Sequence, residues 1–306
     1  MKISRRRALI GAAMFSGTVA CSYWAYRAFA GRGISEVKIT ISGEKRFVLS
    51  NGLPTHPTGD FPNSHDPIAI RSQNLNLEMP LGPEPAPIPV PLDMWLFGVG
   101  VNGVPFEPSG PFWNGDGNSG WQFEVLHPAN AVALGIDGNF AHTQGRGMYH
   151  YHGLPRGLLW DLTVAFPDQA MRLLGFAADG YPIYGPECPG DPTCLNSKPK
   201  RLKSSYKLCS GLRAGGRTSG PGGRHDGAFV QDFEYIPGHG DLDECNGRTG
   251  PTPEYPKGTY YYVLTDEFPF IPRMFHGFPD PSFRHGPPPG VSPPLPGELE
   301  NYQPKA

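Results

Sequence analysis

Short runs in which apolar and polar residues alternate recur along the chain, and such alternation predicts β-strands that bury one face. The clearest run covers 37–41, and residues 47–49 are its expected hairpin partner across a turn at 42–44. Other alternating or wholly apolar runs predict further strands, at 93–101, 176–186, 229–236 and 259–264. In 176–186 the dipeptide Asp179-Gly180 marks a turn, so this run is expected to form two strands.

The best helical candidates lie within 158–174, where apolar residues recur at helical spacing. Pro167 lacks a backbone N–H and is favoured in the first turn of a helix. We therefore expect Pro167 to divide this segment into two short helices.

The chain contains 37 prolines and 41 glycines, and proline-rich connectors are expected over 51–63 and 83–91. Aromatic residues make up 12% of the chain, a hydrophobic content that disordered chains lack. A long basic, glycine-rich loop is expected over 195–228. Together these features predict a mainly β, loop-rich α+β fold, with a single domain over 31–285 and one or two short helices. The proline-rich tail, 286–306, is expected to be disordered.

Residues 1–30 have the pattern of an export signal. Arg5, Arg6 and Arg7 resemble the twin-arginine signal and precede an apolar run over 8–20, and a small-x-small site predicts cleavage before Gly31. The general secretory route, lipid attachment at Cys21 and an uncleaved membrane anchor remain alternatives. We expect a periplasmic or extracellular protein that contacts a membrane only through this segment.

The formal net charge of −2 conceals an asymmetry, because residues 1–30 carry five basic residues and no acidic one. The remainder carries 21 basic and 28 acidic residues, and no basic stripe runs through it. We therefore do not expect a nucleic-acid partner.

Four cysteines follow the predicted signal, and an even number in an oxidising compartment predicts two disulfides. Cys188 and Cys194 flank a tight loop, so the expected pairs are Cys188–Cys194 and Cys209–Cys245. A cysteine-rich metal site is the alternative, but no two of these cysteines have the two-residue separation of a zinc knuckle.

The chemistry of the chain concentrates in 142–152, which holds three histidines. If this segment forms a strand, His150 and His152 point to one face, and a glycine-rich turn can bring His142 back toward them. Three imidazoles that leave a coordination position open suit a transition metal such as zinc or copper, with His56 as a possible additional ligand. Met148 lies on the same side as His150, and a thioether there would favour copper. The alternative is a purely structural strand of tyrosine and histidine.

A second segment, 258–263, repeats the pattern of 147–152. Both contain tyrosine at the same two positions, whereas His150 and His152 correspond to Tyr261 and Val263. A shared strand scaffold therefore requires the tyrosines and not the imidazoles, which favours a chemical role for the histidines.

Two aspartates are candidates for catalysis at a metal site. Asp137 and Asp179 could orient a ligating imidazole or act as general base, although each lies beside a glycine and could simply cap a turn. A calcium site is the alternative cofactor prediction, at the cluster formed by His239, Asp241, Asp243, Glu244 and Asn246. The sequence contains no Gly-x-Ser-x-Gly elbow, so it does not support a serine nucleophile.

The chain resembles the YHYH-domain family, named for the motif found here at 149–152. The resemblance extends over roughly residues 50–278 and includes further matching segments, at 51–54, 102–106, 134–137, 179–186 and 242–248. It implies no activity, because the family name describes a motif and not a reaction. Two functions therefore remain: a metal-dependent enzyme such as a hydrolase, or a non-catalytic module that binds a small molecule or a surface ligand.

Overall fold

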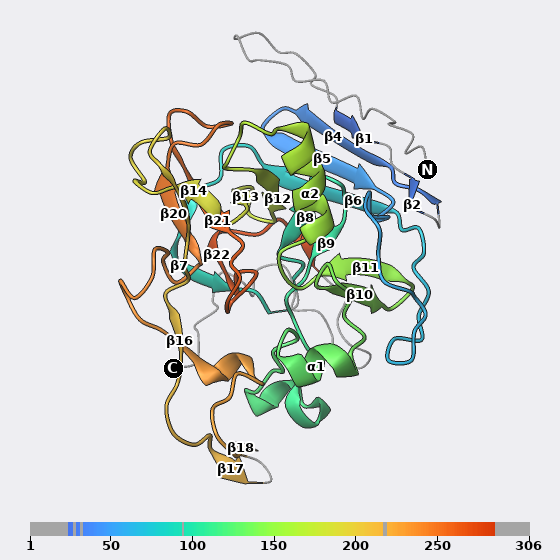
Figure 1. Ribbon diagram of the computed structural model, residues 1–306, viewed down its shortest axis with the longest axis vertical. Helices are drawn as coiled ribbons and strands as arrows, with labels where there is room; N and C mark the ends of the chain where they lie inside the picture. The colour runs from blue at the N-terminus through green and yellow to red at the C-terminus, as the bar shows by residue number, and fades with distance from the viewer. Residues whose placement is uncertain (1–23, 27–28, 31–32, 94, 217–218, 285–306) are drawn as a thin grey trace, which may run out of the picture.

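The computed structural model describes residues 24–26, 29–30, 33–93, 95–216 and 219–284 (Figure 1). Most of the predicted export signal and all of the predicted tail at 286–306 lie outside the described residues. Strands β1 (Trp24–Tyr26) and β2 (Phe29–Ala30) are the described parts of the signal segment. No helix within the described ranges is long and apolar enough to cross a membrane.

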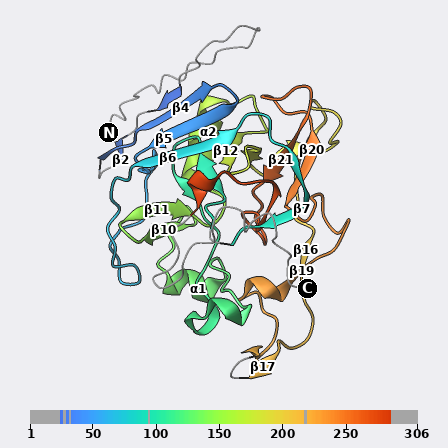
Figure 2. The same ribbon diagram turned by 180° about the vertical axis from the view of Figure 1, so that it is seen from behind.

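A four-stranded antiparallel sheet, in the order β1-β4-β5-β6, lies at one end of the molecule (Figures 1 and 2). It contains β4 (Val37–Ser42), β5 (Lys45–Ser50) and β6 (Leu75–Pro80). The first two strands form the hairpin that the alternating pattern predicts, with Ser42 opposite Lys45. Val37 and Ile39 are buried as the alternation requires.

The largest sheet has eight strands in the order β10-β11-β9-β8-β12-β13-β21-β20. The strands of its first half are β8 (Gly98–Gly100), β9 (Pro105–Phe106), β10 (Ala141–Gln144) and β11 (Met148–Tyr151). Those of the second half are β12 (Leu173–Ala177), β13 (Pro182–Tyr184), β20 (Gly247–Gly250) and β21 (Thr259–Val263).

The two halves repeat one arrangement. In each, an antiparallel pair (β8 with β9, β12 with β13) is followed by a parallel pairing to a later hairpin (β9 with β11, β13 with β21). The hairpins share a register, since His142 lies opposite His150 and Arg248 lies opposite Tyr261. The halves join through β8 and β12, which are antiparallel. The similarity of 147–152 to 258–263 is therefore part of a repeat of four strands.

The turns of the two halves also match. Asp137 and Asp243 each cap the turn before a hairpin, and their backbone N–H groups donate to Ala141 and Gly247 at 2.8 and 2.9 Å. Between the paired strands, the backbone N–H of Gly100 donates to Val104 just as that of Ala177 donates to Tyr181. The repeat therefore provides an internal comparison, in which any difference between equivalent side chains is not required by the strands.

Two α-helices occur among the described residues, α1 (Pro128–Ala133) and α2 (Arg156–Ala165). Leu158 of α2 is buried and lies near Gly100 of β8, so this helix covers the central strands (Figure 1). The prediction of a second helix after Pro167 is wrong, because Leu173–Ala177 is strand β12. That apolar run is buried on both faces between two neighbouring strands, and such a run has no periodicity that separates strand from helix.

The rest of the domain consists of short elements that pack around the sheets. The paired strands are β2 with β3 (Gly33–Ile34), β7 (Pro85–Pro91) with β22 (Met274–Gly277), β14 (Glu187–Pro189) with β15 (Pro199–Arg201), β16 (Tyr206–Leu208) with β19 (Phe233–Tyr235), and β17 (Gly215–Gly216) with β18 (Gly220–Pro221). The described part of the chain also forms the 3₁₀ turns η1 (Trp113–Gly115), η2 (Gly117–Ser119), η3 (Val230–Asp232) and η4 (Pro281–Phe283). Of the predicted strand 229–236, only the part in β19 is a strand, and the predicted connector 83–91 contains strand β7. The mainly β, loop-rich class is confirmed.

The prediction of two disulfides is wrong in this structure, where the four cysteines of the described part are free. Cys188 is buried, whereas Cys194 lies on an exposed loop. Cys245 is buried in the main core, whereas Cys209 is partly exposed. Each expected pair thus joins a core position to a more exposed one.

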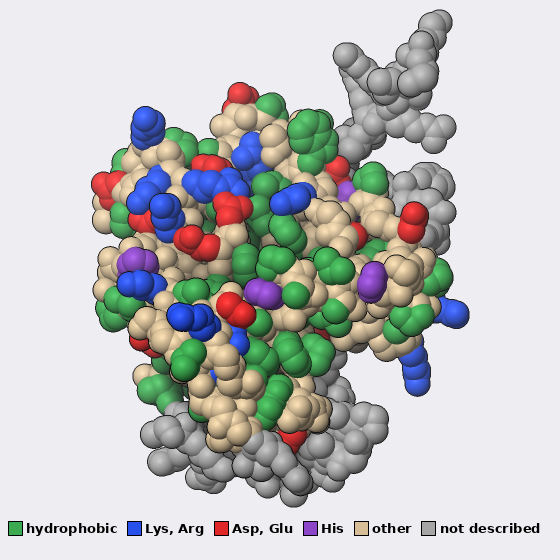
Figure 3. All heavy atoms as spheres, turned by 60° about the horizontal axis from the view of Figure 1, so that its bottom comes forward, with side chains coloured by type: hydrophobic (Ala, Val, Ile, Leu, Met, Phe, Trp, Pro, Cys, Tyr) green, Lys and Arg blue, Asp and Glu red, His purple; other side chains and the backbone are tan. Residues whose placement is uncertain are grey.

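Surface charge is mixed on the face drawn in Figure 3, where basic and acidic side chains lie close together between hydrophobic ones. Exposed side chains of the described residues also form ion pairs, among them Arg201 with Glu187 at 2.9 Å and Lys45 with Glu78 at 2.9 Å. Such exposed pairs are screened by solvent and contribute little to the stability of a fold.

Candidate metal centre

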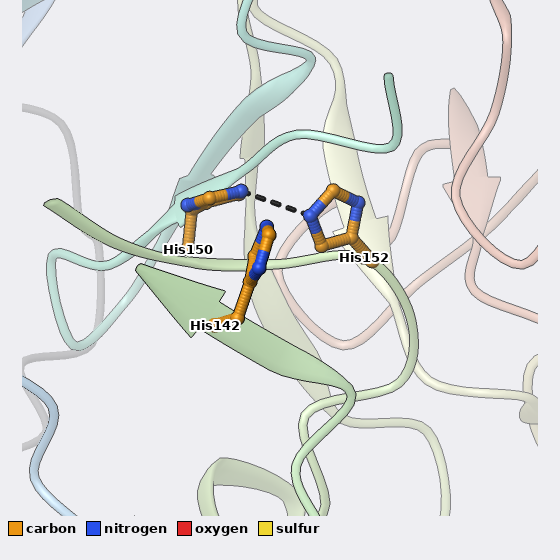
Figure 4. A group of neighbouring side chains, drawn as sticks. All are labelled: His142, His150 and His152. Atoms are coloured by element: carbon orange, nitrogen blue, oxygen red, sulfur yellow. Dashed lines mark hydrogen bonds between the residues drawn. The ribbon is translucent and has the colours of Figure 1, made fainter. Parts of the chain in front are cut away.

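Three histidines meet beside the β10–β11 hairpin (Figure 4). His142 lies on β10, His150 lies opposite it on β11, and His152 follows directly after that strand. One ligand nitrogen from each ring lies within 4.8 Å of the other two, and the ring centroids are 4.7 to 5.0 Å apart. The structure therefore brings together the three histidines that the sequence singled out.

Backbone carbonyls orient two of the rings. Nδ1 of His142 lies 2.9 Å from the carbonyl oxygen of Leu134, and Nδ1 of His150 lies 3.2 Å from that of Met148. A carbonyl only accepts, so each Nδ1 must carry the proton and donate it. Nε2 of both rings then keeps its lone pair, which is the tautomer that a metal ligand needs.

His152 completes the group from a buried position. Its Nε2 lies 2.9 Å from Nε2 of His150, and its side chain is almost entirely inaccessible to solvent. Burial lowers the pKa of His152 well below its ordinary value, and the neighbouring rings of His150 and His142 lower it further. This imidazole is therefore neutral at physiological pH.

The three rings form one wall of a cavity of about 320 Å³. Polar and acidic side chains line it together with apolar ones, namely Asp93, Glu107, Ser109, Phe112, Gln122, Val125, Leu134 and Gln144. Oε2 of Glu107 lies 4.0 Å from Nε2 of His150 and accepts a hydrogen bond from the amide of Gln144. Neither Glu107 nor Gln144 was predicted from the sequence. Gln144 could have been found, because it lies two positions after His142 on the same strand.

These residues lie within a region that matches a known family model, described as "YHYH protein", over residues 76–277. The chain belongs to the YHYH family. No curated protein and no solved structure matches it. The YHYH motif is Tyr149-His150-Tyr151-His152, so its two histidines face the cavity described above.

The two tyrosines of the YHYH motif face the opposite side, where both are fully buried. The hydroxyl of Tyr151 lies 2.6 Å from Nε2 of His56 and accepts from the amide of Asn102 at 2.9 Å. His56 is thus hydrogen-bonded to a tyrosine and does not join the other three histidines. The structure therefore places His56, which was predicted as a possible additional metal ligand, on the face of β11 opposite to the three histidines.

Asp137 also belongs to the tyrosine face of the motif. Its carboxylate accepts hydrogen bonds from the hydroxyl of Tyr149 at 2.7 Å and from the backbone N–H of Gly59 at 2.9 Å. The structure therefore places Asp137 in a turn that anchors the hairpin, and not beside the cavity. Met148 packs against the main hydrophobic core and does not line the cavity either.

Asp179 lies in the second half of the sheet, at the position that Asn102 occupies in the first. Its buried carboxylate accepts hydrogen bonds from the hydroxyl of Tyr262 and, at 2.9 Å, from the backbone N–H of Gly277. Burial raises the pKa of Asp179 to about 6, since the loss of hydration outweighs the hydrogen bonds. The structure does not bring Asp179 to the three histidines.

The raised pKa of Asp179 predicts a pH-dependent stability. Between about pH 4 and pH 6 the folded state holds a proton that the unfolded state has lost, so the unfolding free energy falls as the pH rises. The contribution is about 3 kcal/mol across this window. Urea denaturation at pH 4 and pH 7 should show this loss for the wild type relative to Asp179→Asn. A difference between the two proteins that is the same at both pH values would contradict the assignment.

The predicted calcium cluster at 239–246 does not converge in the structure. Asp243 caps its turn by accepting from the backbone N–H groups of Cys245 and Gly247 at 3.0 and 2.9 Å. Asp241 instead pairs with Lys200. Within the described ranges, His142, His150 and His152 are the only group of three or more histidine, cysteine or acidic side chains placed to hold a metal ion.

Proposed function

We propose that His142, His150 and His152 bind one divalent transition metal, and that the protein is exported and acts as a metal-dependent hydrolase. The observation that carries the metal site is the orientation of the rings. Two carbonyls hold the Nδ1 protons of His142 and His150, so Nε2 of each ring carries the lone pair that a metal ligand requires. The basic and apolar pattern of residues 1–30 supports export.

A hydrolase is the activity that best suits three imidazoles beside an accessible cavity. Three protein ligands leave a fourth position for water, and zinc in such a site lowers the pKa of that water to about 7. The cavity of about 320 Å³ adjoins the rings and offers room for a small substrate.

Zinc suits this donor set better than copper does. The thioether of Met148 would have favoured copper, but it packs against the main core. Imidazole nitrogens alone suit zinc, copper and iron, and zinc needs no additional soft ligand.

Metal titration of protein freed of metal by a chelator tests the site. We expect one equivalent of zinc, and likewise of cobalt, per chain, because the three nitrogens form one group. Visible absorption of the cobalt protein should show the intense bands of a tetrahedral site. Less than a tenth of an equivalent of either metal would overturn the proposal.

A further inference from the structure

We propose that Phe112 limits the size of the cavity, so that the site takes small, largely apolar carboxylic esters or amides and excludes longer ones. The cavity of about 320 Å³ has the volume of roughly ten water molecules in the liquid. This proposal rests on the proposed metal site. It adds the class of substrate and a residue that determines it, neither of which follows from the three histidines alone.

A short hairpin forms one side of the cavity. Phe112 and Gln122 are paired in an antiparallel bridge, and both line the cavity. The pairing is extended by a backbone hydrogen bond of 2.9 Å from the N–H of Trp113 to the carbonyl of Trp121. Phe112 is therefore carried on a hydrogen-bonded pair of extended segments.

Further contacts hold this side of the cavity in place. The side-chain amide of Gln122 donates to the carbonyl of Gly110 at 2.9 Å, and its backbone N–H donates to the side-chain oxygen of Gln231 at 2.8 Å. A Cβ atom at position 117 would lie 3.7 and 3.8 Å from two ring carbons of Phe112, so little space separates the ring from the backbone of η2. These contacts oppose displacement of the ring by a ligand.

The cavity offers apolar contacts beside the histidines. Val125 is buried and lines it together with Phe112 and Leu134. The carbonyl oxygen of Leu134 also lies 2.9 Å from Nδ1 of His142, which places this residue next to one of the proposed ligands. Each methylene that a substrate buries against such residues raises its affinity by about fourfold, until the cavity is full. An apolar group is therefore favoured up to the size of the cavity and disfavoured beyond it.

The lining of the cavity favours carboxylic esters and amides over phosphate and sulfate esters. None of the described residues that line it is a lysine or an arginine, the side chains with which proteins most often pair such anions. Hydrolysis of an ester or amide balances with water as the other reactant. The hydroxyl of the water bonds to the carbonyl carbon, the bond from that carbon to the alcohol oxygen or amine nitrogen breaks, and the remaining proton goes to the leaving group. The products are a carboxylic acid and an alcohol or amine.

The internal repeat shows that the strands by themselves do not create this cavity. In the second half, the residues equivalent to the last two histidines are Tyr261 and Val263. They belong to a hydrophobic cluster that also contains Leu202, from the segment between β13 and β20. In the first half, the segment between β9 and β10 carries Phe112 and leaves a cavity beside the histidines. The size of the site is therefore set by this segment and not by the sheet.

Binding of imidazoles of increasing length to the cobalt-loaded full-length protein tests the size limit. Imidazole, phenylimidazole and biphenylylimidazole share one metal-binding ring, and the visible spectrum of cobalt reports their binding. The wild type should bind phenylimidazole at least ~10-fold more tightly than biphenylylimidazole, because the longer ligand does not fit. Phe112→Ala should remove this difference, and Phe112→Leu repeats the test if the alanine variant does not fold.

Phe123→Ala is the matched control for these variants. Phe123 lies on the same hairpin but does not line the cavity, and its ring stacks on that of Phe229 at a centroid distance of 4.7 Å. This variant should keep the preference of the wild type for phenylimidazole.

Hydrolysis by the zinc-loaded protein tests the substrate class. We expect phenyl acetate to be hydrolysed with a kcat/KM at least ~10-fold above that of phenyl octanoate, and phenyl phosphate not to be hydrolysed. Phe112→Ala should narrow the difference between the two carboxylic esters, whereas Phe123→Ala should preserve it.

The outcomes separate this proposal from the metal site. A cobalt-loaded wild type that binds the two longer imidazoles equally would overturn the size limit, and a difference that persists in both variants of Phe112 would overturn the role of that residue. Hydrolysis of phenyl phosphate in place of phenyl acetate, or of neither, would overturn the substrate class. Each of these results leaves the metal site standing, whereas absence of cobalt from the wild type would overturn the metal site and this proposal with it.

Discussion

The double variant His150→Ala/His152→Ala is expected to bind less than a tenth of an equivalent of zinc under conditions that load the wild type fully. The variant removes two of the three nitrogens that converge beside the β10–β11 hairpin and leaves His142 alone. Loss of an outer-shell partner already lowers metal affinity by about 10- to 100-fold, and loss of two direct ligands should exceed this. Metal content after dialysis, measured by atomic emission, gives the result.

His56→Ala is the matched control for the double variant. His56 is buried like the other two, but its imidazole contacts the hydroxyl of Tyr151 on the opposite face of β11. This variant should retain a full equivalent of zinc even if its stability falls. If His56→Ala lost the metal while the double variant retained it, the site would lie on the tyrosine face.

The tyrosines of the two hairpins should dominate stability. Tyr151→Ala and Tyr262→Ala are each expected to lower the unfolding free energy by about 3–5 kcal/mol, because each removes a fully buried aromatic ring. Each change also removes a tyrosine hydroxyl that is hydrogen-bonded to a buried polar side chain, namely Asn102 in one half and Asp179 in the other. Urea denaturation followed by tryptophan fluorescence measures both losses.

Trp160→Ala serves as the control for these large substitutions. Trp160 lies on α2 and is 69% exposed, so its removal should change stability by less than about 0.5 kcal/mol. The equivalence of the two halves further requires that the two tyrosine variants lose similar amounts. A loss near zero in one half would show that its hairpin does not support the sheet.

Local spacing was sufficient to predict the histidine group. His142, His150 and His152 lie within one hairpin, so alternation along β11 and one turn determine their faces. The same reasoning could not place His56 or Asp137, since their partners depend on how distant segments pack. Glu107 was missed for a related reason, because only the parallel pairing of β9 with β11 brings it to the site.

Composition and counting were weaker guides than periodicity. The even number of cysteines suggested two disulfides, but spacing does not reveal which side chains point into the core. The apolar run at Leu173–Ala177 suited a helix as well as a strand, and burial on both faces decided the outcome. By contrast, the six-residue similarity between 147–152 and 258–263 correctly indicated a shared strand scaffold. In the structure the similarity extends to all four strands in each half of the largest sheet.

The placement of all three histidines in one hairpin has a consequence for the order of folding. Hairpins of this kind close within about 1–10 μs, whereas pairing of distant parallel strands is slowed by the entropy of closing a long loop. The three histidines of the β10–β11 hairpin should therefore come together early, and Glu107 should join them only when β9 pairs with Tyr151. If the nascent hairpin captures a metal ion, this binding event would occur before the cavity that contains Glu107 has formed.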